Sequence, residues 1–158
     1  MNWLATLPAR LDRWPDGWVR LLGRLAVGLV FWLSGQTKVE GLVLDPIHAT
    51  VELGWPRLSP AVVDLFRDEY RLPLLPPELA ATLAATGEHL LPLMLVLGLG
   101  TRFAALGLLA MTAVIQFLVY PGAFPTHGTW AAVLLWLVLR GPGPLALDGW
   151  IAARTAAR

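Results

Sequence analysis

The sequence contains no cysteine and little charge. Without cysteine, the chain can form no disulfide, thiol relay, thiolate-held iron–sulfur cluster or cysteine-ligated zinc site. Charged residues make up 15% of the 158 residues, against about 25% in ordinary soluble domains. The sequence also lacks phosphate-binding loops and nucleophile-elbow motifs. Any redox chemistry therefore requires a bound cofactor, another subunit or a quinone from the lipid.

Hydrophobic residues dominate the composition. They make up 56% of the chain, and the mean hydropathy is +0.62. Several apolar runs approach the roughly 20 residues that a helix needs to cross a bilayer. The net charge of +1 gives no electrostatic basis for binding nucleic acid. The sequence therefore predicts an integral protein of the lipid bilayer.

Four apolar segments predict an all-α fold, a transmembrane four-helix bundle that forms a single domain over residues 1–158. The expected spans are about 19–37, 79–99, 103–120 and 126–140. The last is the shortest, because at 1.5 Å per residue it reaches only roughly 20 Å of the roughly 30 Å hydrocarbon core. No small-x-small cleavage site follows Leu33, so we expect the first span to be retained.

Residues 38–77 differ from the spans in being rich in acidic residues and proline. They contain six of the eleven acidic residues and many prolines. Ser59-Pro60 is a helix-start signal, and from Ala61 to Tyr70 the apolar and charged side chains take opposite sides. The segment therefore predicts a long outer loop with a short amphipathic helix, suited to lying on the membrane or over the bundle mouth. A partner protein would bind at this loop.

Lysine and arginine counts predict the orientation, because basic residues favour cytoplasmic loops. Four basic residues lie in the expected outer loop: Lys38, Arg57, Arg67 and Arg71. Eight lie on the opposite side: Arg10, Arg13, Arg20, Arg24, Arg102, Arg140, Arg154 and Arg158. Both termini are therefore expected in the cytoplasm.

Two ionisable residues, Glu88 and His89, lie halfway along the second expected span. An acidic residue at the centre of a membrane helix costs roughly 2.5 to 3.5 kcal/mol on insertion-based scales, so such residues usually line a pathway or pair within the protein. Neighbouring side chains on a helix diverge by about 100°. We therefore expect one of the two to face the bundle centre and the other an adjacent helix.

Polar residues of the other spans are expected near this pair, in the outer half of the bundle. A carboxylate and an imidazole can pass protons when a quinone is reduced or a quinol is oxidised. The structural alternative is that Glu88 pairs with Lys38 or Gln116 only to hold helices together. Glu88 and His89 are candidate proton carriers, and the candidate cofactor-binding cluster is Gln36, Lys38, Gln116, Tyr120 and His127.

A metal or haem site is not favoured by the pattern. The three histidines, His48, His89 and His127, share no close spacing. The sequence indicates no cofactor other than the quinone considered above.

The sequence resembles the DoxX family of small four-helix membrane proteins over about residues 20–150. The stretches FWLSGQTKVEG and YPGAFPTHGTWA are most similar to the branch often encoded beside multinuclear iron oxidative enzymes that modify metal-binding peptides. Many relatives have serine where this chain has Ala146. The resemblance rests on Arg24-x3-Gly28-x2-Phe31-x3-Gly35-x2-Lys38, on Glu88, on Gly98 to Arg102, and on Gly141-Pro142-Gly143 with Asp148.

The resemblance implies a bacterial inner-membrane protein linked to quinone-dependent redox systems or to stress-response and metal-handling operons.

Three hypotheses for the function follow. The first is a membrane subunit or accessory of a redox system, with a quinone meeting the Glu88 cluster. The second is a non-enzymatic accessory or anchor for a metal-binding-peptide or stress-response partner. The third, a transporter, is the least favoured because the helices carry no broken-helix signals. Whether the protein is an enzyme, and its oligomeric state, are left open.

Overall fold

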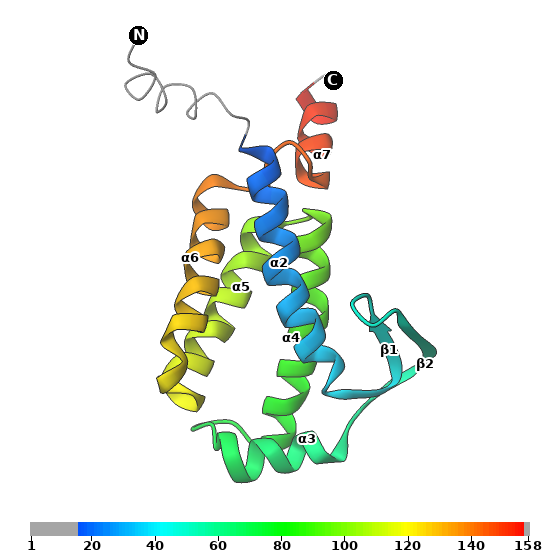
Figure 1. Ribbon diagram of the computed structural model, residues 1–158, viewed down its shortest axis with the longest axis vertical. Helices are drawn as coiled ribbons and strands as arrows, with labels where there is room; N and C mark the ends of the chain where they lie inside the picture. Colours follow the sequence, from blue (N-terminus) through cyan, green and yellow to red (C-terminus); the bar gives the residue numbers. More distant parts are fainter. Residues whose placement is uncertain (1–15, 157–158) are drawn as a thin grey trace.

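The computed structural model describes residues 16–156. The basic residues Arg10, Arg13 and Arg158, which were counted for the orientation, lie outside this range. The described chain is mostly helical, as predicted, and Figure 1 shows its long helices side by side. The long helices are α2 (Gly17–Gln36), α4 (Pro77–Leu97), α5 (Thr101–Val114) and α6 (Phe124–Arg140), and a shorter α7 (Leu147–Ala156) follows them.

The predicted four apolar spans are confirmed, with shifted bounds. Four helical segments are long and apolar enough to cross a membrane: 17–36, 77–97, 101–119 and 121–140. The third combines α5 with the π-helix η2 (Ile115–Val119), and the fourth adds the 3-10 helix η3 (Pro121–Ala123) to α6. The predicted start of the fourth span at residue 126 was too late. Pro121 and Pro125 suggest a turn in the sequence, but proline is well accommodated in the first turn of a helix.

Each long helix contacts two others. Helix α2 packs against α4 and α6, while α5 packs against α4 and α6. Their shared core is apolar and includes Val27, Phe31, Leu95, Leu108 and Leu134. The helices also expose many apolar side chains, such as Leu22, Leu83 and Phe103. Hydrophobic residues on both the inside and the outside are typical of a protein whose solvent is lipid.

Glycine permits the close approach of the C-terminal end of α2 to the middle of α4. A Cβ atom at Gly35 would lie 2.9 Å from the His89 ring and 3.0 Å from Glu88 Cβ. Small residues at a helix interface allow membrane helices to approach closely. Gly35 therefore brings the end of α2 against the middle of α4.

A two-stranded antiparallel sheet occupies the first part of the outer loop, where the sequence pattern predicts a loop without strands. Strand β1 (Val39–Asp45) pairs with β2 (Thr50–Leu58). The Asp45 carboxylate accepts hydrogen bonds from the backbone N–H groups of Ile47 and His48, and these bonds form the turn. Gly41 has φ of 84° where the pairing register shifts, a conformation that glycine adopts readily. Leu42 and Leu44 alternate as in a strand, but the neighbouring acidic residues and Pro46 made this pattern hard to recognise in the sequence.

The second part of the outer loop forms helix α3 (Pro60–Leu65) and the π-helix η1 (Phe66–Tyr70). Val62 and Phe66 are buried against Ala80 and Ala81 of α4. Arg67, on the exposed side of this segment, pairs with Asp64 at 2.6 Å and with Glu78 at 2.9 Å. In Figure 1 the segment lies across the lower ends of the long helices.

Asp148 of α7 holds the helices together at the end opposite to the segment of residues 60–70. Its carboxylate accepts hydrogen bonds from the N–H groups of Gly100 (2.7 Å) and Thr101 (2.9 Å), at the start of α5. Burial alone would raise the pKa of Asp148, but these hydrogen bonds hold it below its ordinary value. Asp148 also attracts Arg24, which is fully buried and donates to the Leu145 carbonyl. Asp148 therefore binds the C-terminal segment to α2 and α5.

We predict that Asp148→Ala destabilises the protein. The change removes both capping acceptors and leaves Arg24 without its nearby anion, and loss of a helix cap alone costs roughly 0.5 to 2 kcal/mol. Thermal unfolding in detergent should show a lower Tm than for the wild type. The matched control is Asp68→Ala, because Asp68 is exposed. Equal melting temperatures for the two variants would contradict this role of Asp148.

Candidate functional site

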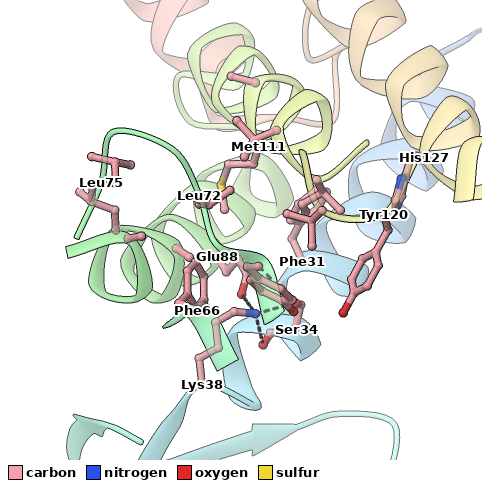
Figure 2. A pocket seen from close by; sticks show the side chains of 18 of the residues that line it. Phe31, Ser34, Lys38, Phe66, Leu72, Leu75, Glu88, Met111, Tyr120 and His127 are labelled. Atoms are coloured by element: carbon pink, nitrogen blue, oxygen red, sulfur yellow. Dashed lines mark hydrogen bonds and ion pairs between the residues drawn. The ribbon is translucent and has the colours of Figure 1, made fainter. Parts of the chain in front are cut away.

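A cavity of about 410 Å³ lies among α2, α4, η2 and α6, beneath the outer helical segment of residues 60–70. Figure 2 shows its lining, which is mostly apolar and aromatic. Both π-helices contribute, with Phe66 and Tyr70 from η1 and Ile115 and Val119 from η2. A π-helix is rare and often marks a functional site. The polar residues in the lining are Ser34, Lys38, Glu88, Tyr70, Tyr120 and His127.

Glu88 and Lys38 form a buried ion pair at one side of the cavity. Lys38 Nζ lies 2.6 Å from Glu88 Oε2, and the two side chains are 8% and 4% exposed. Lys38 Nζ also donates to Ser34 Oγ (3.0 Å), and the Ser34 hydroxyl donates to Glu88 Oε1 (3.2 Å). A buried charge is tolerated when it is paired and hydrogen-bonded. These three residues therefore present a charged wall to an otherwise apolar space.

Local sequence explains the position of this pair. Ser34 and Lys38 are four residues apart at the C-terminal end of α2, so both lie on the same side. Helix α2 ends at Gln36, and Thr37 is its C-cap. The long side chain of the next residue, Lys38, turns back to reach Glu88. Figure 2 shows the lysine, the serine and the glutamate converging.

His89 points away from the cavity. Its Nδ1 lies 2.7 Å from the Ala85 carbonyl oxygen, which only accepts, so this nitrogen carries the proton. Its Nε2 lies 2.8 Å from Gln36 Nε2 and accepts from that amide. Gln36 Oε1 in turn accepts the N–H of Leu44 in β1 (2.6 Å). Both ring nitrogens are therefore occupied, and His89 joins α4 to α2 and to the hairpin.

His127 faces the cavity from the first turn of α6. It is 5% exposed, and its Nδ1 donates to Gln116 Oε1 at 2.9 Å. The amide nitrogen of Gln116 donates to the Pro121 carbonyl (2.7 Å), which orients the amide. In the neutral imidazole, Nε2 is then the acceptor nitrogen. Gln116 does not line the cavity and instead sets the orientation of His127.

Two tyrosines connect the outer helical segment to η2 at the cavity mouth. The Tyr120 hydroxyl donates to Glu69 Oε1 at 2.5 Å, and the rings of Tyr70 and Tyr120 pack edge to face at 5.8 Å. The hydrogen bond to the Glu69 carboxylate raises the pKa of Tyr120 above its ordinary value. Burial raises the pKa of Tyr70. Both phenols therefore remain protonated at neutral pH.

The cavity reaches the lipid-facing surface between α4 and α5. Three of its lining residues are exposed there: Leu83 on α4, and Ala110 and Val114 on α5. The lining suits an apolar ligand with a few polar atoms, as in most small-molecule sites.

The expected polar cluster is thus divided by the structure. Lys38, Glu88, Tyr120 and His127 line one cavity, whereas Gln36 pairs with His89 outside it and Gln116 lies behind His127. Sequence reasoning missed Ser34, Glu69 and Tyr70. The spacing of Ser34 from Lys38 is a local signal, but nothing local connects Glu69 or Tyr70 to residues fifty positions away. Within residues 16–156, no three histidine, aspartate or glutamate side chains are grouped so as to hold a metal ion.

Comparison with protein families gives one match, to the DoxX family over residues 19–121. This range includes all but the first two residues of the first span, the second and third spans, the outer loop and the residues of the buried ion pair. Comparisons with curated proteins and with solved structures give no match. The match covers well over half of the chain and includes the residues on which the predicted resemblance rests up to Arg102. The chain belongs to the DoxX family.

Proposed function

We propose that the protein is a membrane subunit or accessory of a quinone-linked redox system, and that the cavity beside Glu88 binds the quinone ring. One observation supports this most directly. An apolar cavity open to the bilayer contains a buried Lys38–Glu88 pair together with His127. A lipid-soluble ligand with polar ring atoms matches that combination.

The polar groups suit the two oxygens of a quinone. Reduction of a quinone to a quinol adds two electrons and two protons, one proton to each ring oxygen. Lys38 is positioned to donate a hydrogen bond to a carbonyl oxygen, while Glu88 and His127 are the side chains that exchange protons with the ring oxygens. Tyr120 supplies a protonated phenol at the mouth. The electrons are exchanged with a redox partner protein, since the residues of this cavity supply only protons and hydrogen bonds.

The membrane arrangement is part of the proposal. The four spans form a bundle in the bacterial inner membrane, with both termini in the cytoplasm and the loop of residues 38–77 leaving and re-entering the bundle on its outer side. The excess of basic residues at the end that holds α7 supports this orientation. The cavity then opens in the outer half of the bilayer, under the helical segment of residues 60–70.

A second candidate function is a non-enzymatic accessory or anchor for a metal-binding-peptide or stress-response partner. Its support is the outer hairpin, whose β2 strand is exposed over eight of its nine residues. Glu40, Glu52 and Asp45 give that hairpin acidic character. This function would require a partner that binds from outside and no ligand in the cavity.

We predict that Glu88→Gln weakens binding of a short-chain quinone analogue at least about 10-fold, which corresponds to about 1.4 kcal/mol. The change removes the anion that orients Lys38 and exchanges protons. Equilibrium dialysis of purified protein in detergent measures the affinity, and a lipid extract of the wild type shows whether quinone copurifies. The control is Glu78→Gln on the same helix, because Glu78 lies at an exposed position outside the cavity.

A double variant separates ligand binding from a purely structural role. Glu88→Met with Lys38→Met removes both charges, and replacing a whole buried pair by apolar residues is often neutral or stabilising. We expect a stable protein that has lost quinone binding. If the wild type binds no quinone and the double variant behaves like it in every assay, the pair only holds helices together and the proposal fails.

We predict that Ala110→Trp blocks the opening between α4 and α5 and weakens analogue binding several-fold, with the charged residues untouched. Ala113→Trp is the matched control, because Ala113 is exposed on the same helix and does not line the cavity. The same dialysis measurement applies. Equal affinities for both variants would exclude entry between these helices.

We predict a cytoplasmic C-terminus. A green fluorescent protein fused after Arg158 should fluoresce, while an alkaline phosphatase fusion at the same site should be inactive. The reverse pattern would overturn the orientation and place the cavity in the inner half of the bilayer.

A further inference from the structure

The β-hairpin lies beside the spanning helices rather than projecting away from them. Figure 1 shows β1 and β2 next to the lower halves of α2 and α4. Leu44 and Pro46 of the hairpin share a groove of about 560 Å³ with Leu25 of α2 and Pro92 of α4. Trp32 Nε1 of α2 donates to the Leu44 carbonyl oxygen at 2.7 Å. The tip of the hairpin is therefore at the depth of the middle of the membrane helices.

Lipid alone is a poor environment for this hairpin. Its sheet has only two strands, so each strand has one edge without a strand neighbour. Open sheet edges are not found facing hydrocarbon, because their N–H and C=O groups would lack hydrogen-bond partners. Glu52 is exposed two residues after the start of β2, and the Asp45 carboxylate lies 2.7 Å from His48 Nδ1 at the tip. Charges at this depth are also costly unless protein surrounds them.

The exposed side of the hairpin bears an apolar ridge next to the groove. Val51, Leu53 and Trp55 are 64%, 81% and 83% exposed. They alternate along β2, so they share one face of the strand. Val51 pairs across the sheet with Leu44, which lines the groove. Ridge and groove are therefore adjacent and lie at the same depth.

We propose that a second copy of this chain covers the hairpin, in a two-fold dimer whose axis runs along the membrane normal. Such an axis keeps every residue at its own depth, and two copies in one membrane already share their orientation. It brings the ridge of each copy, formed by Val51, Leu53 and Trp55, to the groove of the other, formed with Leu25 and Leu29.

Self-complementarity favours a second copy as the occupant. A two-fold contact uses the same surface of both chains, so it requires a projecting and a hollow feature side by side. The hairpin ridge and the groove satisfy that requirement. The dimer also covers the exposed apolar face of β2 with protein on both chains. The inference is independent of the proposed quinone site, because the hairpin and the groove lie outside that cavity.

The lack of cysteine provides a direct test. Single substitutions Leu53→Cys and Trp55→Cys place one thiol in each chain at the ridge, and membranes are then treated with a short bifunctional thiol reagent. We expect a band at twice the mass of the chain. Phe103→Cys is the matched control, because Phe103 is 78% exposed on α5 and lies outside both ridge and groove. It should give at least about five-fold less dimer.

A second measurement excludes chance collisions in the membrane. Wild-type protein in lipid nanodiscs should contain two copies per disc, as counted by single-molecule photobleaching of a C-terminal fluorophore, and Leu53→Glu should shift this to one. Equal cross-linking at residues 53 and 103, one copy per disc for the wild type, or cross-linking of residue 53 to a different protein would each overturn the dimer. Quinone binding by a single-copy protein would leave the proposed function intact.

Discussion

Hydrocarbon offers no hydrogen bonds, so every polar group between the ends of the spanning helices requires a partner within protein. This constraint accounts for the main tertiary contacts. Lys38 turns back beside Ser34 to meet Glu88, Asp148 lies against the start of α5 near the buried Arg24, and both nitrogens of His89 are occupied. The contacts of Lys38 with Glu88, of Asp148 with Gly100 and of His89 with Gln36 join elements that are distant in the chain. The helices are therefore held in place by a few buried polar contacts within an apolar surround.

The candidate site follows from the same constraint. Satisfying Glu88 from one side, through Lys38 and Ser34, leaves the other side of the pair facing an apolar space. His127 and Tyr120 approach that space from other helices, each oriented by its own partner. Polar groups that are already held in position need little rearrangement when a ligand arrives. The arrangement supports a site for a lipid-soluble molecule whose polar atoms exchange protons.

The outer loop illustrates the limits of reading a pattern along the chain. Ser59-Pro60 and the amphipathic pattern after it predict a helix, and residues 60–70 are helical. The strands before it were missed, because β pairing depends on residues across the turn and on the support of Trp32 and Gln36 from α2. Neither contact has a signature within the strand itself. Strand propensity in general reflects packing against neighbours more than an intrinsic preference.

The sequence by itself determined the membrane character, the number of apolar spans and the place of the carboxylate of Glu88 midway along one of them, because length, hydropathy and residue position are local properties. Adjacency also determined that Glu88 and His89 diverge. Only the tertiary structure decided that Glu88 lines the cavity while His89 does not, and that Tyr70 joins Tyr120 at its mouth. These outcomes depend on how the helices rotate and pack against one another. That rotation is set by contacts such as Gly35 against His89, which connect residues more than fifty positions apart.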